Sequence, residues 1–360
     1  MYRRYFIRSA SLFAASLTTA KLLSSCSSSN QTEANSATPT SETSEPTAAT
    51  PPEATNVTAL DANIEALSFG IISTESQANQ RPIWEPLIQA MSEGLEMPVN
   101  ASYATSYAAV IEAMRFGKVH AAWFGGKSYI EAAKIANAEA FARTIADDGS
   151  KGYYAHLITN KDNPIVSEIQ NGNGDQYVIK NASNLTFAFN EPNSTSGFLV
   201  PSYYVFAKNN VDPKKIFKDL VFSGSHEATA LAVANNQVDV ATNNNESLSR
   251  LEKTNPEARE QIEVIWTSVE IPSDPLAYRK DLPEALKEKL RNFFYNYKDE
   301  TVLGPLEWSG FEAAQDQDWN PIRELEVGKQ ILEVQSNETM DAAQKEQKIQ
   351  ELQKQLEALS

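Results

Sequence analysis

The chain has few of the residues that build disulfides, metal sites and membrane spans. Its 360 residues include one cysteine and three histidines, which excludes an intramolecular disulfide and argues against a metal cluster. No apolar run approaches the roughly 18 residues that a membrane-spanning helix needs. Lys and Arg number 31 against 47 Asp and Glu, a formal net charge of −16, which argues against a nucleic-acid-binding surface. What remains is the composition of a globular protein long enough for two domains.

The first 26 residues have the features of an export signal. Three arginines lie among the first eight residues, and a weakly apolar stretch without acidic residues follows. The sequence LLSSC, which ends at Cys26, resembles a lipobox and places the single cysteine where lipid attachment requires it. We therefore predict a lipoprotein export signal over residues 1–26, with Cys26 as the lipidation site. A secretion signal with a chance cysteine is the alternative, and the Arg3-Arg4 pair leaves twin-arginine and general export both open.

Residues 27–60 differ from the rest of the chain. They contain no aromatic residue, lysine or arginine and are rich in Ser, Thr, Pro and Ala. Such a segment cannot bury enough apolar surface to offset the entropy lost on ordering. We predict a disordered linker that tethers a folded body to the membrane.

From residue 64 onward, strand-like runs alternate with amphipathic helical spacings. We predict strands over 66–72, 119–125, 185–189, 238–242 and 262–267, and helices over 83–95, 107–116, 128–136, 197–208, 226–235 and 282–297. This alternation favours parallel pairing in α/β lobes. The predicted division is lobe 1 over 61–160, lobe 2 over 161–268, a return to lobe 1 over 269–320 and a C-terminal helical region over 321–360.

The C-terminal region carries a short apolar seam of Ile349, Leu352, Leu356 and Leu359 among Glu, Gln and Lys. These spacings of three and four residues are typical of a helix with one apolar face, but they cover only two heptads. Packing on the second lobe and homodimerisation through this helix are both compatible with the seam.

The segment after the predicted strand 185–189 is the most informative for function. Ser194, Thr195 and Ser196 precede Gly197 where a helix is expected to begin. Backbone N–H groups at a helix start lack intrahelical partners and attract anions, and hydroxyls add donors without adding charge. Simple N-capping is the alternative, although a cap needs only one such residue. Pro201 would kink this helix unless the helix starts late.

Other polar residues follow predicted strands. Glu246 comes shortly after strand 238–242, and Asp274 follows strand 262–267 after a short loop. In open α/β sheets such strand ends line a ligand crevice, where two carboxylates would form a site for an ammonium group. Singly, each carboxylate is equally typical of a solvated or capping group. His226 is by default a cap or surface residue.

Four longer runs together resemble the phosphonate-binding proteins of ABC importers. They are FGIISTE at 69–75, VIEAMRFGKV at 110–119, NSTSGFLVP at 193–201 and LAVANNQVDVAT at 231–242. The resemblance extends from about residue 67 to the C-terminus. It implies an α/β, two-lobed type II periplasmic-binding-protein fold with a C-terminal helical extension, in which the ligand lies between the lobes.

The resemblance also implies ligand contacts, residue by residue. Ser194, Thr195 and Ser196 match the phosphonate donors, assisted by Tyr107 and His226, and Tyr153 matches a cleft tyrosine. Glu246 and Asp274 match the carboxylates that hold the amine of an aminoalkylphosphonate such as 2-aminoethylphosphonate. Tyr107 and Tyr153, taken alone, could equally be core residues. Two departures stand out: Gly126 where asparagine is expected, and an altered surface loop over 170–184.

The resulting expectation is a lipid-anchored binding protein in the periplasm or on the outer face of the cytoplasmic membrane. Its partners would be a small phosphonate and the permease subunits, with no cofactor, metal or nucleic acid. Phosphite, phosphate or methylphosphonate are alternative ligands, since relatives differ in preference. A hydrolase using Ser194, His226 and Asp274 is a competing interpretation, but the sequence has no Gly-x-Ser-x-Gly motif. A structural lipoprotein acting through the C-terminal helix is a third.

Overall fold

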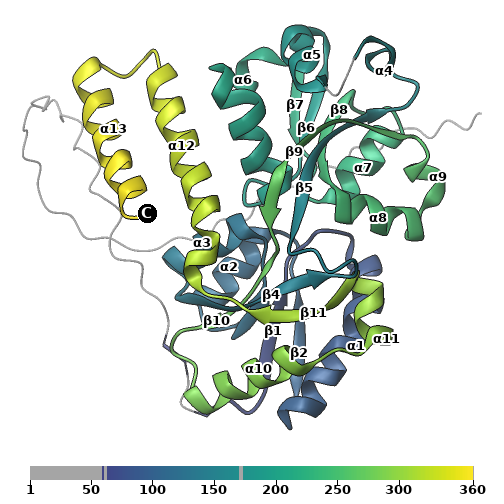
Figure 1. The fold of residues 1–360 in the computed structure, drawn as a ribbon, viewed down its shortest axis with the longest axis vertical. Coiled ribbons are helices and arrows are strands. Elements are labelled where there is room, and N and C mark those ends of the chain that lie inside the picture. The colour runs from purple at the N-terminus through teal and green to yellow at the C-terminus, as the bar shows by residue number, and fades with distance from the viewer. Residues whose placement is uncertain (1–58, 61–62, 170–172, 360) are drawn as a thin grey trace, which may run out of the picture. The chain divides into compact units, whose positions relative to one another are not determined.

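The computed structural model describes residues 59–60, 63–169 and 173–359 (Figure 1). The predicted export signal with Cys26 and nearly all of the predicted linker lie outside the described residues. No helix within the described part of the chain is both long and apolar enough to cross a bilayer.

In the described part of the chain, the first sheet has six strands in the order β11-β4-β10-β3-β1-β2. They are β1 (Leu67–Ile71), β2 (Val99–Tyr103), β3 (Ala121–Trp123), β4 (Ala138–Ala146), β10 (Pro275–Arg279) and β11 (Trp308–Ala313). β1 lies parallel between β2 and β3, with Phe69 opposite Ala101 and Ala121. β10 and β11 join this sheet antiparallel to their neighbours.

The second sheet has five described strands in the order β7-β6-β8-β5-β9. They are β5 (Gly152–Asn160), β6 (Thr186–Phe189), β7 (Asp219–Phe222), β8 (Val240–Asn244) and β9 (Ile262–Pro272). Successive residues of β6 and β8 enter different apolar clusters: Phe187 and Val240 contribute to one, Ala188 and Ala241 to the other. Because neighbouring side chains in a strand point to opposite faces, this sheet is buried on both sides.

Among the described helical elements around the two sheets, five come from segments that the sequence predicts to be helical, and the others were not predicted. Around the first sheet the helical elements are α1 (Gln77–Leu95), α2 (Tyr107–Arg115), α3 (Gly126–Ile135), α10 (Glu284–Asn296) and α11 (Glu300–Leu303), with the short turns η5 (Gly304–Leu306) and η6 (Asp316–Trp319). Around the second they are α4 (Ile165–Glu168), α5 (Gly174–Asn181), η1 (Ala182–Asn184), α6 (Pro213–Ile216), α7 (His226–Ala234), α8 (Asn245–Thr254) and α9 (Pro256–Arg259). α1 begins six residues before the predicted start and contains Pro82 and Pro86.

The expectation of parallel pairing is only partly correct. β1, β2 and β3 are parallel, as are β6, β7 and β8. β4, β5, β9, β10 and β11 pair antiparallel instead, and the sequence analysis missed four of these five. β5 also belongs to the second sheet, although the predicted division places residues up to 160 in the first lobe. The reason is that the chain changes sheet at 147–151, before β5, and returns at residues 273–274, between β9 and β10.

The segment that begins at Thr195 is helical, as predicted, but unusually wound. η2 (Thr195–Leu199) and η3 (Ser202–Phe206) are π-helical turns, and η4 (Ala207–Asn209) closes the segment. The Leu199 N–H donates to the Ser194 carbonyl, five residues back. Pro201 therefore does not delay the helix start. It lies between two wide turns, where its missing N–H is tolerated.

The region 170–184 is not simply a surface loop, which corrects the sequence interpretation for the residues described here. It contains α5, whose Val178 is fully buried in an apolar cluster of the second lobe. Gly174, at the start of α5, lies so close to the Ile265 carbonyl that a Cβ would be 2.2 Å from its oxygen. The helix is thus held against β9 at a point where only glycine fits.

Two C-terminal helices, α12 (Asn320–Ser336) and α13 (Ala342–Glu357), lie side by side (yellow in Figure 1). α12 contacts α3 of the first lobe and η3 and η4 of the second. The apolar seam of α13 is used against α12, and Leu352 is its buried residue. α12 rather than α13 therefore provides the main packing on the second lobe, and homodimerisation stays an untested hypothesis.

Candidate ligand-binding site

All eight ligand contacts predicted from the sequence line one cavity. These residues come from separate segments of both lobes, and their side chains are buried or partly buried. They are Tyr107, Tyr153, Ser194, Thr195, Ser196, His226, Glu246 and Asp274. The cavity is also lined by residues that the sequence analysis did not identify, among them Thr74, Trp123, Gly125, Asn244 and Arg250.

Helix starts converge on this cavity. In the described part of the chain, five helices begin at residues that line it. Tyr107 and His226 are the first residues of α2 and α7, and Gly125, Ser194 and Asn244 cap the starts of α3, η2 and α8. Each start contributes N–H groups that have no acceptor within their own helix, together with partial positive charge. The fold therefore creates an anion-attracting environment even though the chain carries a net negative charge.

The three consecutive hydroxyls have different structural partners. Ser194 Oγ accepts from the Gly197 N–H at 3.0 Å, so Ser194 is the N-cap. Thr195 Oγ1 accepts from the Lys127 N–H at 2.9 Å, and Ser196 Oγ accepts from the Asn244 side-chain amide at 3.0 Å. The capping interpretation is thus correct for Ser194 alone. Since each oxygen accepts a hydrogen bond, each O–H remains able to donate toward the cavity.

The two tyrosines are neutral donors. Burial raises the pKa of both Tyr107 and Tyr153, and the nearby Asp274 carboxylate raises both further. Hydrogen bonding with Ser194 and Thr195, respectively, acts in the opposite direction but is the weaker effect. Both phenols consequently keep their protons at neutral pH, as a contact to an anion requires.

His226 is buried at the start of α7, where Ser225 is the N-cap, contrary to the default expectation of a cap or surface histidine. Burial, with a smaller contribution from the Arg250 charge, lowers its pKa to about 3, so the ring is neutral. Its Nε2 lies 3.5 Å from Ser194 Oγ and 3.4 Å from the Asn244 amide nitrogen. Nδ1 is buried and has no hydrogen-bond partner among the described residues. A hydrolase triad needs a carboxylate on that nitrogen, so this geometry does not support the hydrolase interpretation.

Glu246 and Asp274 contribute two buried carboxyl groups to the same cavity. Burial raises the pKa of Asp274 well above its usual value, and the neighbouring Glu246 charge raises it further. Burial also raises the pKa of Glu246, while Arg250 acts against the increase. Asp274 Oδ1 is buried without a partner within the described residues. Two adjacent carboxylates in such surroundings are stabilised by a cation placed between them.

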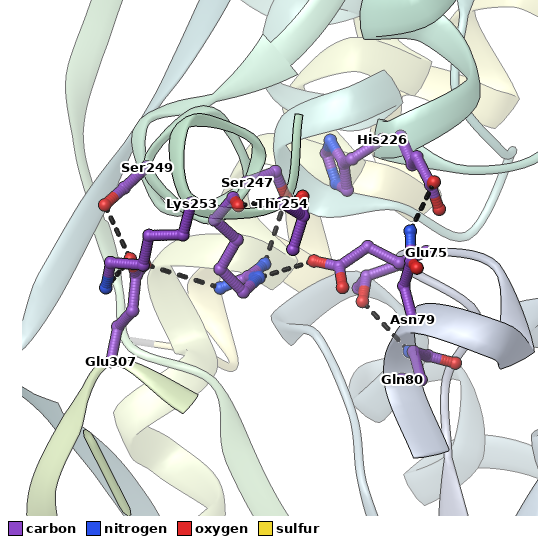
Figure 2. A network of polar contacts seen from close by, with 12 residues as sticks. Glu75, Asn79, Gln80, His226, Ser247, Ser249, Lys253, Thr254 and Glu307 are labelled. Atoms are coloured by element: carbon purple, nitrogen blue, oxygen red, sulfur yellow. Dashed lines mark hydrogen bonds and ion pairs between the residues drawn. The ribbon is translucent and has the colours of Figure 1, made fainter. Parts of the chain in front are cut away.

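Arg250 is the most important residue that sequence reasoning missed. Its Nε donates to Glu75 Oε1 at 2.5 Å, and it forms a longer ion pair of 3.8 Å with Glu307. Glu307 also accepts from Ser249 and Lys253, at 2.5 and 2.7 Å (Figure 2). The arginine charge is therefore shared with carboxylates outside the cavity and leaves Glu246 and Asp274 incompletely neutralised. The four-residue spacing of Glu246 and Arg250 on α8 was the only local signal.

The two lobes are joined across the cavity by further hydrogen bonds. The His226 N–H donates to the Thr74 carbonyl at 3.0 Å. The Glu227 carboxylate accepts from the Ser76 N–H at 2.6 Å and from the Asn79 amide at 2.7 Å. With Arg250 bridging Glu75 and Glu307, these contacts hold the lobes closed over the site.

Residues 69–319 match the sequence profile of a family described as "ABC transporter, phosphonate, periplasmic substrate-binding protein". The chain belongs to this family. It is 47% identical over 299 residues to the phosphonates-binding periplasmic protein of Escherichia coli, a match that covers 82% of this chain and 86% of the relative.

Solved structures agree with this membership. A binding-protein component of an ABC phosphonate transporter from Pseudomonas aeruginosa is 47% identical, with a TM-score of 0.78 over 82% of this chain and 97% of that one. A Prochlorococcus marinus protein in complex with methylphosphonate is 25% identical, with a TM-score of 0.64 over 72% and 97% of the two chains. The predicted family and two-lobed fold are thereby confirmed.

Family membership also defines the general role. The chain is a periplasmic substrate-binding protein of a phosphonate ABC importer, and its relatives are transport proteins rather than enzymes. The departure at position 126 has a local explanation, because a Cβ on Gly126 would lie 3.1 Å from Ile322 and 3.3 Å from Trp319. α12 and the turn before it occupy the space that a larger residue would need.

Proposed function

We propose that this protein binds an aminoalkylphosphonate, such as 2-aminoethylphosphonate, in the cavity between its lobes. The observation that supports this most is that one cavity is lined by two chemically different sets of side chains. The first set is the hydroxyls of Ser194, Thr195 and Ser196, and the second is the carboxylates of Glu246 and Asp274. Hydroxyl donors suit a phosphonate group, and paired carboxylates suit an ammonium group.

The phosphonate would be held by neutral donors. Ser194, Thr195 and Ser196 are each 1% exposed, so water does not compete for their hydroxyl protons. Tyr107, Tyr153 and His226 are neutral and lie in the same cavity. Charge-assisted hydrogen bonds of this kind are worth about 1.5–3 kcal/mol each.

The amine determines which phosphonate is preferred. A ligand without an amine would leave Glu246 and Asp274 desolvated and unpaired in the closed cavity, which is costly. An aminoalkylphosphonate supplies the missing cation. The competing proposal is a smaller ligand, namely phosphite, phosphate or methylphosphonate, and the methylphosphonate complex of the P. marinus relative favours that alternative.

Calorimetric titration distinguishes these proposals. We expect 2-aminoethylphosphonate to bind at least tenfold more tightly than ethylphosphonate, because one charge-assisted hydrogen bond already accounts for about that factor. Methylphosphonate, phosphite and phosphate complete the panel. Tighter binding of any of these three than of the amino compound would favour the small-anion alternative. For a Glu246→Gln variant titrated with the same ligands, the control for the loss of one negative charge is Glu252→Gln, which changes an exposed residue on the same helix.

We further propose that the protein is a lipoprotein anchored through Cys26, with residues 27–60 as the tether that lets the folded body reach its permease subunits. Support comes from the lipobox-like sequence that ends at the single cysteine. Mass spectrometry of the membrane-associated protein should identify an acylated Cys26 as the first residue. A soluble mature form cleaved at another position would contradict this.

A further inference from the structure

A second cavity adjoins the amine side of the ligand site. The two cavities share five residues: Thr74, Trp123, Glu246, Arg250 and Asp274. Glu246 and Asp274 therefore form part of both walls. An amine held by these two carboxylates would therefore also border the second cavity.

Three tryptophans dominate the wall of this second cavity. Trp84, Trp123 and Trp308 all line it, and their ring centroids lie 5.2 to 5.8 Å apart. Trp84 and Trp308 line only this cavity, as does Leu306. The first lobe brings these rings together from α1, β3 and β11.

Carboxylates beside aromatic rings are the chemistry that recognises alkylated ammonium groups. The carboxylates attract the positive charge, and the rings contact carbon without needing a hydrogen bond. A small primary amine would use only the carboxylates and leave the tryptophan wall without a role in binding.

We propose that the amine subsite accepts N-methylated aminoalkylphosphonates, with N-methyl-2-aminoethylphosphonate bound at least as tightly as the primary amine. This inference rests on the proposed function. A primary ammonium has three N–H donors, and Glu246 and Asp274 can pair two of them. Replacing the third N–H with a methyl group leaves both carboxylates paired and places the methyl against the tryptophans.

The same reasoning limits the degree of methylation. A trimethylammonium group has no N–H donor, so it keeps its attraction to Glu246 and Asp274 only as a charge. It should bind at least tenfold more weakly than the monomethyl compound, since the hydrogen bonds to both carboxylates are lost.

Calorimetric titration with the primary, N-methyl and N-trimethyl compounds tests the proposal. We expect the N-methyl compound to bind between equally and about fourfold more tightly than the primary amine, the gain for burying one methyl group. An N-methyl compound that binds more weakly than the primary amine would overturn the inference while leaving the proposed function intact. So would a trimethyl compound bound as tightly as the monomethyl one. If none of the three compounds bound, the proposed function would fail instead.

Variants of Trp308 test whether the tryptophans contact the N-methyl group. Trp308→Leu should lower the ratio of N-methyl to primary-amine affinity, whereas Trp308→Phe, which keeps an aromatic face, should preserve it. Trp266→Leu, in β9 of the second lobe, is the matched control because Trp266 lines neither cavity. If Trp308→Leu left the ratio of N-methyl to primary-amine affinity unchanged, the tryptophans would have no role in recognising the methyl group.

Discussion

Replacing Thr195 with valine should weaken phosphonate binding without altering preference for the amine. Thr195 Oγ1 is buried and already accepts from the Lys127 N–H, so its proton is directed to other acceptors. Valine keeps the side-chain shape but cannot donate. The loss of one hydrogen bond to a charged group costs about 1.5–3 kcal/mol, which corresponds to a Kd about 10- to 150-fold higher.

Calorimetry on the Thr195→Val and Thr195→Ser variants provides the assay. The serine variant retains the hydroxyl and should stay within about threefold of the parent. Because Thr195 is proposed to contact the phosphonate group, which both ligands share, 2-aminoethylphosphonate and ethylphosphonate should weaken by the same factor in the valine variant. Valine also leaves the Lys127 N–H without its acceptor, so urea unfolding must confirm that the variant is folded. Unchanged affinity, or a loss confined to the amine-bearing ligand, would refute this assignment of Thr195.

Two further predictions concern the charged side of the site. Arg250→Met should lower the free energy of unfolding by about 3 kcal/mol in urea titrations, because Glu75 loses its buried ion-pair partner and Glu307 loses one of its two cationic partners among the described residues. An unchanged midpoint would contradict the bridging role. Asp274→Asn should stabilise the unliganded protein more at about pH 8 than at about pH 5. The pKa of Asp274 is raised in the folded state, so the parent loses stability as pH rises through that pKa and this carboxyl ionises. Thermal unfolding at both pH values measures the difference, and equal shifts would argue against a raised pKa.

Local patterns in the sequence predicted the parts of the site that local structure creates. The three hydroxyls after β6 follow from a strand end and a helix start, and the apolar spacing of α2 places Tyr107 at its first turn. The family resemblance assigned His226, Glu246 and Asp274 to the ligand site, and the structure places all three in one cavity. These signals are carried by a few consecutive residues, so they can be recognised without knowing the fold.

Long-range pairing could not be predicted in this way. Arg250 acquires its role from Glu75, which is 175 positions away, and the tryptophan wall combines α1, β3 and β11. The antiparallel strands escaped notice for the same reason, because β10 is placed by the chain's return from the second lobe rather than by its own five residues. The π-helical turns around Pro201 pack against β8 and β5 of the second lobe and also against α3 and α12, and the alternation of polar and apolar residues does not encode such contacts.

The most direct test of the central claim is a thermodynamic cycle between Glu246→Gln and the ligand amine. Calorimetry would give the Kd of 2-aminoethylphosphonate and of ethylphosphonate for the parent and for the variant. If Glu246 holds the ammonium, the substitution should weaken the amino compound at least tenfold more than ethylphosphonate, a coupling of about 1.5 kcal/mol or more. Ethylphosphonate should be unaffected or bind better, because the variant has one desolvated charge fewer. Equal losses for both ligands would contradict the proposed amine site and favour a simple anion as the ligand.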